Sequence, residues 1–189
     1  MIHFYKDIEG FMSDKNKIAF DFIIPQLPTH SVWVELGSWT GKSTAYCVVE
    51  LKNQNKFGDF YCVDTWEGGP EHQENQLIKD KTLYEIFETN IKPVIDDVHI
   101  VKSLSWDSSK RFADNSVDVC YVDAGHEYEC VVKDIAHFWP KIKVGGWLFG
   151  DDFTKSFPGV QKAVREFAIS NNVSVQRKGR CWCMKKETQ

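Results

Sequence analysis

The sequence predicts an α/β domain with a mostly parallel β-sheet covered by helices on both faces. Short runs rich in β-branched residues alternate with longer amphipathic stretches, which is the pattern of repeated strand–helix units. The run 117–122 is apolar except for Asp118, as is typical of a strand buried on both faces. A chain of 189 residues, 42% of them hydrophobic, is long enough for one domain with a substantial core.

Five strands and a weaker carboxyl-terminal pair are expected, separated by helices. The predicted strands are Ser31–Leu36, Asp59–Asp64, Val98–Ser103, Val117–Asp123, Gly146–Asp151, Val173–Gln176 and Cys181–Lys185. The predicted helices are Lys42–Leu51, Gln73–Asn90, Trp106–Phe112, Tyr128–Trp139 and Val160–Ser170. Residues 1–30 are expected to form a helical segment packed on the core of the main part of the domain, residues 31–189.

Each of the first five strands stops at a polar residue or a turn. The stops are Glu35 with Gly37, Asp64, Ser103, Asp123 and Asp151. Ligands of open parallel sheets bind beyond the carboxyl ends of the strands. The five stops are therefore expected to share one edge of the sheet and to form a site there.

Composition narrows the class of partner. A formal net charge of −4 argues against a nucleic-acid binder, which normally carries a basic face. The chain starts without a secretory-signal pattern, and no stretch approaches the roughly 20 apolar residues of a membrane span. The six cysteines lack zinc-site spacing, which favours buried, reduced thiols. We therefore expect a cytoplasmic protein without nucleic-acid or membrane partners.

The segment VELGSWTGKST, residues 34–44, ends like a phosphate-binding P-loop. That motif would place its first glycine at Leu36, whereas the glycine is Gly37, so the loop is one residue too short. The dinucleotide motif G-x-G-x-x-G fails at Trp39. The pattern that remains is an acid, Glu35, followed by Gly37 and Gly41.

This pattern fits a ligand with an amino-acid end and a nucleoside end. Gly37 and Gly41 allow close backbone approach, and the amides that open the next helix can receive a carboxylate. Glu35 is placed to attract an ammonium group, and Asp64 to accept hydrogen bonds from two ribose hydroxyls. S-adenosylmethionine (SAM) carries all of these groups. Turn glycines and strand-ending acids would explain each residue singly, but not the set.

The chain also resembles a known family. The segments VELGSWTGKST, YCVDTWEGG, VDVCYVDAGHEY, VGGWLFGDDF and PGVQKAVREF follow one another between about residues 31 and 168. They are similar to class I SAM-dependent methyltransferases, and more closely to the macrocin and mycinamicin sugar O-methyltransferases. The resemblance implies a Rossmann-like, seven-stranded, mostly parallel sheet. Trp39 replaces a glycine of the general motif, and the sugar-methylating group tolerates a bulky residue there.

The resemblance assigns roles to individual residues. It implies a Mg²⁺ site at Asp123, Asp151 and Asp152, which agrees with the preference of Mg²⁺ for oxygen ligands. It implies His126 as general base beside Asp123, with a pKa near neutrality. The cofactor residues that it implies, together with the motif, are Glu35, Gly37, Ser38, Gly41, Ser43, Asp64, Thr65, Trp66, Ser103, Leu104, Ser105 and Asp123. The alternative is a structural role for these residues. The three aspartates would then cap the loops and turns that follow their strands, and His126 would cap the next helix.

The expected function is metal-assisted O-methylation of a sugar or other small polar molecule. A metal-independent methyltransferase and a non-catalytic SAM-binding protein are the alternatives, and binding of ATP or NAD would indicate a hydrolase or a dehydrogenase. Residues 69–81 are expected to form a mobile lid. The aromatic residues near the N-terminus could pack on a second copy of the chain as well as on their own sheet, so a homo-oligomer is one of the expected possibilities.

Overall fold

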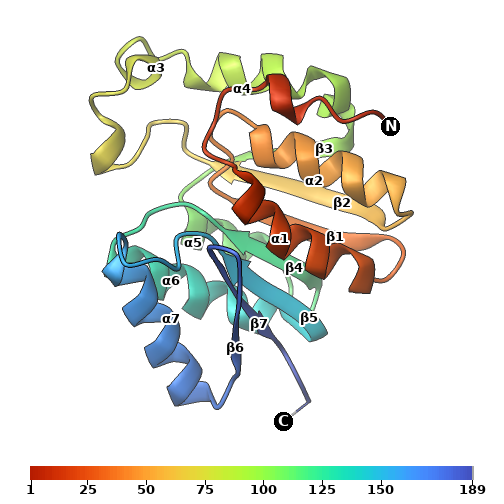
Figure 1. The fold of residues 1–189 in the computed structure, drawn as a ribbon, viewed down its shortest axis with the longest axis vertical. Coiled ribbons are helices and arrows are strands. Elements are labelled where there is room, and N and C mark those ends of the chain that lie inside the picture. The colour runs from red at the N-terminus through yellow and green to blue at the C-terminus, as the bar shows by residue number, and fades with distance from the viewer. Residues whose placement is uncertain (189) are drawn as a thin grey trace.

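The computed structural model describes residues 1–188, which form one seven-stranded sheet with helices on both faces (Figure 1). The strands are β1 (Ser31–Leu36), β2 (Phe57–Asp64), β3 (Val98–Lys102), β4 (Val117–Val122), β5 (Ile142–Gly150), β6 (Val175–Lys178) and β7 (Cys181–Lys185). Their order in the sheet is β3-β2-β1-β4-β5-β7-β6. The first five strands pair in parallel, and β7 is antiparallel to β5 and β6. The predicted fold class is confirmed.

The helices lie between the strands and before the first of them. They are α1 (Asp14–Ile23), α2 (Lys42–Asn53), α3 (Gln76–Lys79), α4 (Leu83–Ile91), α5 (Ser105–Ser108), α6 (Tyr128–Phe138) and α7 (Pro158–Asn171). Short 3-10 turns include η1 (Tyr5–Asp7), η2 (Ile24–Gln26), η3 (Pro70–His72), η4 (Lys92–Asp97), η5 (Ser109–Arg111) and η6 (Trp139–Lys141). No helix in residues 1–188 is long and apolar enough to cross a membrane.

Alternate residues of the central strands face two separate cores. On one face, Phe20 of α1 packs edge-on against Tyr121 and Phe149, with ring centroids 4.8 and 5.1 Å apart. The helices α1, α2 and α4 cover this face, and α6 and α7 cover the other, where Cys120 and Leu148 are buried. Every residue of β4 is buried, because this strand lies between two neighbours and under helices on both sides.

The predicted helix Gln73–Asn90 is divided in the structure. One turn of 3-10 helix, η3, precedes the short α3, and α4 begins only at Leu83. Lys81 adopts a left-handed conformation with φ of 59°, which ends α3 and redirects the chain. The hydrophobic pattern of residues 73–90 therefore extends over two helices and the turn between them.

Other boundaries differ by a few residues. The strand β5 begins at Ile142, before the predicted Gly146. The helix α7 ends at Asn171, and β6 is shifted to Val175–Lys178. Residues 105–111 form a short α5 and a 3-10 turn instead of one helix. The hydroxyls of Ser108 and Ser109 donate hydrogen bonds to backbone carbonyls three residues earlier, which favours the tight turn.

Five of the six cysteines are buried and all six are free, while Cys130 is only half-buried. Cys181 and Cys183 both belong to the core on the α1 side, as their alternation along β7 requires. The expectation of reduced, buried thiols therefore holds except at Cys130, which lines the cavity described below.

A buried acid lies between α5 and α6. Asp134 is fully buried, and neither of its carboxyl oxygens has a hydrogen-bond partner of normal geometry within residues 1–188. Burial raises the pKa of Asp134 from 3.8 to about 7, and the nearby Ser105 hydroxyl and Lys133 charge offset this only partly. The carboxyl is therefore protonated in the folded protein at mildly acidic pH.

Substitution of this acid is expected to change the pH dependence of stability. The stabilising contribution of Asp134 is fully present below about pH 4 and is lost as the pH rises toward 7, because only the unfolded chain releases the proton in that range. Asp134→Asn lacks this titration. Its Tm relative to the wild type should therefore rise by roughly 8–16 °C between about pH 4 and 8. A Tm difference between the two proteins that is independent of pH in thermal unfolding would contradict this assignment.

Candidate functional site

The loop after β1 crosses the end of β4 at very short range. Gly37 has φ of +90°, and a Cβ atom at this position would lie 2.0 Å from the carbonyl oxygen of Asp123. The backbone of the loop is fixed from both sides, since Gly37 donates to the Val63 carbonyl at 2.8 Å and Asp123 donates to the Leu36 carbonyl at 2.8 Å. Only glycine combines this conformation with this approach.

Asp64 connects the first two loops of the carboxyl edge. One of its carboxylate oxygens accepts the backbone N–H of Trp39 at 2.9 Å, and the other accepts that of Trp66 at 2.7 Å. Burial raises the pKa of Asp64, and these backbone hydrogen bonds oppose the rise. Each oxygen keeps a second lone pair for a ligand hydroxyl.

Glu35 lies beneath the loop rather than in the cavity. Its side chain is fully buried and accepts a hydrogen bond from the Thr44 hydroxyl of α2. Burial raises the pKa of Glu35 to about 7, and the hydroxyls of Ser43 and Thr44 act against this. The structure therefore differs from the expected direct contact with a ligand ammonium group, because the strand end points its side chain under the helix.

Gly41 and Trp66, two further expected cofactor residues, contact α4 rather than the cavity. Gly41, with φ of +86°, lies against the side chains of Phe87 and Ile91 of α4, which leave no room for a Cβ. The Trp66 indole is buried against Phe87 and donates its N–H to the carbonyl of Trp39 at 3.1 Å. Neither Gly41 nor Trp66 lines the cavity.

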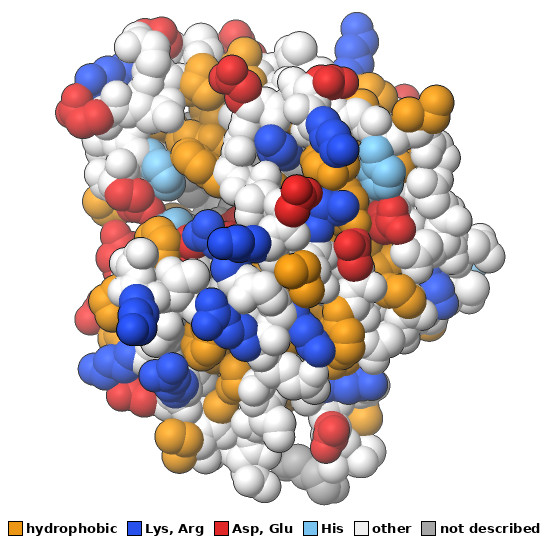
Figure 2. Space-filling view, viewed as in Figure 1, with side chains coloured by type: hydrophobic (Ala, Val, Ile, Leu, Met, Phe, Trp, Pro, Cys, Tyr) orange, Lys and Arg blue, Asp and Glu red, His pale blue; other side chains and the backbone are white. Residues whose placement is uncertain are grey.

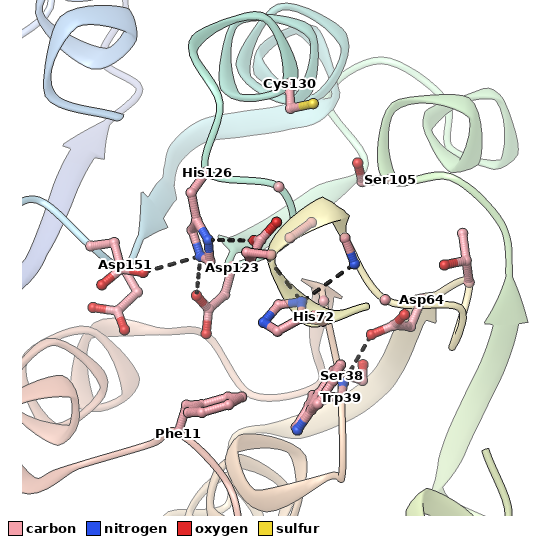
Figure 3. A pocket seen from close by; sticks show the side chains of 18 of the residues that line it. Phe11, Ser38, Trp39, Asp64, His72, Ser105, Asp123, His126, Cys130 and Asp151 are labelled. Atoms are coloured by element: carbon pink, nitrogen blue, oxygen red, sulfur yellow. Dashed lines mark hydrogen bonds and ion pairs between the residues drawn. The ribbon is translucent and has the colours of Figure 1, made fainter. Parts of the chain in front are cut away.

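A cavity of about 600 Å³ opens at the carboxyl edge of the sheet. The expected site residues that line it are Gly37, Ser38, Ser43, Asp64, Thr65, Ser103, Leu104, Ser105, Asp123, His126, Asp151 and Asp152. Asp64 and Ser105 lie at one side of the cavity, and His126 and Asp151 lie at the other (Figure 3). The fold thus brings the stops of five strands into one site, as the parallel arrangement predicts.

Aromatic residues gather between the two sides. The Trp39 and His72 rings have centroids 4.6 Å apart, and Phe11 packs against both at 5.7 and 6.0 Å (Figure 3). Trp39 belongs to the loop after β1, His72 to η3 and Phe11 to the segment before α1. The N-terminal segment and residues 70–72 therefore meet over the first loop and border the cavity.

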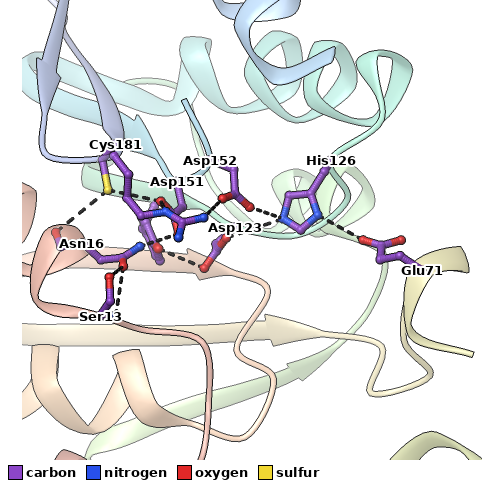
Figure 4. A network of polar contacts seen from close by, with 10 residues as sticks. Ser13, Asn16, Glu71, Asp123, His126, Asp151, Asp152 and Cys181 are labelled. Carbon is purple, nitrogen blue, oxygen red and sulfur yellow. Dashed lines mark hydrogen bonds and ion pairs between the residues drawn. The ribbon is translucent and has the colours of Figure 1, made fainter. Parts of the chain in front are cut away.

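An acidic cluster with two cationic partners forms the other side of the cavity (Figure 4). His126 Nε2 lies 3.0 Å from Asp152 and 3.8 Å from Asp123, and its Nδ1 lies 3.0 Å from Glu71. Asp123 also accepts the Tyr121 hydroxyl at 2.9 Å. Ligand atoms of Asp123, His126 and Asp152 all lie within 4.8 Å of one another, which is close enough for one metal ion.

The charge state of His126 differs from the expectation of a near-neutral pKa. Burial lowers the pKa of the imidazole, but the hydrogen bonds and charges of Asp123 and Asp152 outweigh it and raise the pKa to about 11. In this arrangement His126 is an imidazolium that donates to carboxylates. It can accept a proton only after the influence of these carboxylates is reduced.

Asp151 is turned away from this group. One carboxylate oxygen accepts the Arg180 Nε–H at 3.1 Å, and the other accepts the side-chain N–H of Asn16. Arg180 also pairs with Asp152. The expected trio of aspartates is thus close together in the fold, but His126 takes the place of Asp151 in the group with metal-site geometry.

Arg180, Asn16 and Glu71 are site residues that the sequence did not reveal. Arg180 precedes β7, and the antiparallel direction of β7 brings its first residues to the carboxyl edge of the parallel strands. A last strand recognised as antiparallel would have pointed to Arg180. Nothing in the local sequence of Asn16 or Glu71 indicates a place beside residues that follow more than 50 positions later.

Comparison with known proteins defines the class of the chain. Residues 34–153 match the family model described as a methyltransferase domain, so the chain belongs to this methyltransferase family. The expectation of a methyltransferase is therefore confirmed. The match covers the loop after β1, the ends of β2 and β4, and the Asp151–Asp152 pair.

Solved methyltransferases share the fold. The O-methyltransferase NovP has a TM-score of 0.73 at 17% identity, with 92% of this chain and 80% of NovP covered. A SAM-dependent O-methyltransferase from Thermotoga maritima has a TM-score of 0.63 at 14% identity, covering 96% of this chain and 68% of that one. At these identities the likeness establishes the class I methyltransferase fold.

A sequence relative comes from Acanthamoeba polyphaga mimivirus. This chain is 25% identical over 145 residues to the uncharacterized protein R132, and the match covers 71% of this chain. The chain spans 59% of the length of that curated relative.

Proposed function

We propose that the protein transfers the methyl group of SAM to a hydroxyl oxygen of a sugar or other small polar molecule, assisted by Mg²⁺. The observation that carries the proposal is the cavity of about 600 Å³ in a methyltransferase domain, with Asp64 at one side and an acid–histidine group at the other. Assignment to the macrocin and mycinamicin group is part of this proposal and rests on the shared motifs.

The residues of the cavity fit the parts of SAM. Asp64 offers a carboxylate with lone pairs left for two ribose hydroxyls, and Ser103 to Ser105 border the same side for the adenine. Ser38 and Ser43 line the cavity beside the amides that open α2, which suits the cofactor carboxylate. Gly37 also lines the cavity, where the loop crosses the end of β4.

The donor set also fits a divalent cation. Asp123 and Asp152 offer carboxylate oxygens of the kind that Mg²⁺ prefers. Bound there, Mg²⁺ would lower the pKa of an acceptor hydroxyl and offset the charge of the two carboxylates that now keeps His126 protonated. His126 faces both aspartates and is in place to take the hydroxyl proton, while Glu71 holds its other ring nitrogen.

The proposal is tested by ligand-induced shifts in Tm and by transfer of a labelled methyl group. We expect stabilisation by SAM and S-adenosylhomocysteine but not by ATP or NAD, and transfer to a saccharide acceptor that stops with EDTA and resumes with Mg²⁺. A response to ATP or NAD alone would indicate a hydrolase or dehydrogenase. Transfer that persists in EDTA would favour a metal-independent enzyme, and SAM binding without any transfer would favour a binding protein.

Loss of the acid at the end of β2 is expected to weaken cofactor binding. An Asn side chain at position 64 has one acceptor oxygen instead of two, so either a loop amide or a ribose hydroxyl loses its partner. We expect Asp64→Asn to raise the Kd for S-adenosylhomocysteine roughly 10- to 100-fold in calorimetry. Asp59→Asn, an exposed change on the same strand, is the control. Equal affinity of the two variants for S-adenosylhomocysteine would show that Asp64 does not bind the cofactor.

We further propose that the enzyme works in the cytoplasm on a small molecule, and that nucleic acid is not its partner. Six free cysteines are consistent with a reducing compartment, and the net charge of −4 is unfavourable for a polyanion.

A further inference from the structure

Arg180 occupies the space between the two aspartates that follow β5. Its Nε–H donates to Asp151 at 3.1 Å and its terminal N–H pairs with Asp152. Both carboxylate side chains are about 7% exposed, whereas the Arg180 side chain is 32% exposed. A guanidinium stays protonated throughout the physiological pH range, so this site contains a permanent positive charge.

The N-terminal helix fixes the orientation of Asp151. The second oxygen of Asp151 accepts a hydrogen bond from the side-chain amide of Asn16, a residue that is 1% exposed. The amide orientation of Asn16 is set by Ser13, whose backbone N–H donates to the Asn16 oxygen at 2.9 Å. Both oxygens of Asp151 are therefore bonded to protein donors that approach from β7 and from α1.

The neighbouring carboxylate is directed differently. Asp152 keeps one oxygen for Arg180, while the other lies 3.0 Å from His126 Nε2, on the side of the cavity that Asp123 shares. The two consecutive aspartates therefore have different partners: Asp151 is bonded to Arg180 and Asn16, and Asp152 to Arg180 and His126. Asp152 adopts a left-handed backbone conformation with φ of 58°, and its side chain is turned away from that of Asp151.

We propose that Arg180 is a positioning residue for the divalent cation: it holds Asp151 out of the coordination set and neutralises part of the charge of Asp152. This inference rests on the metal site of the proposed function. The cation is then bound through Asp123 and Asp152 and more weakly than three free aspartates would bind it. Fewer protein ligands leave more coordination positions for water and for acceptor hydroxyls.

The test measures binding of Mn²⁺ to the full chain by calorimetry and electron paramagnetic resonance, without an activity assay. Arg180→Met removes the charge but keeps an unbranched side chain, Arg180→Lys keeps the charge, and Arg177→Met removes an exposed arginine from β6, the strand paired with β7. We expect Arg180→Met to bind Mn²⁺ at least about tenfold more tightly than wild type. The Arg180→Lys and Arg177→Met variants should remain within about threefold, because both keep a positive charge beside the two aspartates.

A second pair of variants tests the same inference in proteins that retain Arg180. Asp152→Asn should weaken Mn²⁺ binding at least about tenfold, and Asp151→Asn by less than about threefold, because only Asp152 is a ligand. Unchanged or weaker binding by Arg180→Met would overturn the proposal, as would a larger loss for Asp151→Asn than for Asp152→Asn. Absence of Mn²⁺ binding in every variant would overturn it too, while intact binding of S-adenosylhomocysteine would leave the methyltransferase proposal standing.

Discussion

His126→Ala is expected to lower kcat for methyl transfer by roughly 10²- to 10⁴-fold, the usual contribution of a general acid–base group. The imidazole lies 3.0 Å from Asp152 and 3.8 Å from Asp123, beside the place proposed for the acceptor hydroxyl. Alanine leaves no group there to take the proton. The Kd for S-adenosylhomocysteine should change by less than about threefold, since Asp64 and Ser105 lie at the other side of the cavity.

His137→Ala provides the matched control for this substitution. His137 is exposed on α6, the helix that follows the His126 loop, and its Nδ1 lies 2.7 Å from the Lys133 carbonyl oxygen, away from the acidic cluster. We expect its kcat to equal that of wild type in single-turnover and steady-state assays. A kcat for His126→Ala within about threefold of wild type would assign His126 to the structure of the loop rather than to proton transfer.

Gly37→Ala is expected to lose both stability and cofactor binding. The added Cβ would meet the Asp123 carbonyl oxygen at 2.0 Å, and the left-handed φ of +90° is itself unfavourable for alanine. The atoms nearest to the added Cβ are backbone atoms of Asp123 and Ala124, directly after the central strand β4. They cannot move away without disturbing the sheet. We expect a loss of about 3–5 kcal/mol, which lowers Tm by roughly 6–20 °C for a domain of this size.

Gly145→Ala separates the steric part of this effect from the conformational part. Gly145 has φ of +84°, close to that of Gly37, but no atom lies within 4 Å of its hypothetical Cβ. Its substitution should cost only about 1–2 kcal/mol and leave the affinity for S-adenosylhomocysteine unchanged. Equal losses of Tm in the two variants would mean that the crossing of the first loop with β4 relaxes freely.

The sequence was sufficient to predict which edge of the sheet carries the site. Parallel strands end at one edge, so Asp64, Asp123 and Asp151 could be placed together from their positions after strands alone. The sequence also singled out Gly37, as a place of close backbone approach to a ligand, and the structure shows that its positive φ and its crossing with the end of β4 require glycine there. These inferences depend on chain direction and on local conformation, which neighbouring residues determine.

The direction of individual side chains could not be read in the same way. Glu35 lies one residue before the end of β1, whereas Asp64 is the last residue of β2, and the carboxyl of Glu35 lies under α2 and outside the cavity. In a strand, a shift of one residue reverses the face to which a side chain points, so the exact end of β1 decides this outcome. Gly41 and Trp66 lie outside the strands, and they contact α4 instead of the cavity because α4 packs against the first two loops.

By itself, therefore, the sequence determined the class of fold, the first loop and the edge at which the site forms, because these follow from local patterns along the chain. Only the tertiary structure decided how the charges at that edge are paired. Arg180 and Asn16 reach Asp151 from segments 29 and 135 residues away, and Glu71 reaches His126 across 55 residues. Such pairings arise from the packing of β7, α1 and η3 around the sheet, which no short stretch of sequence encodes.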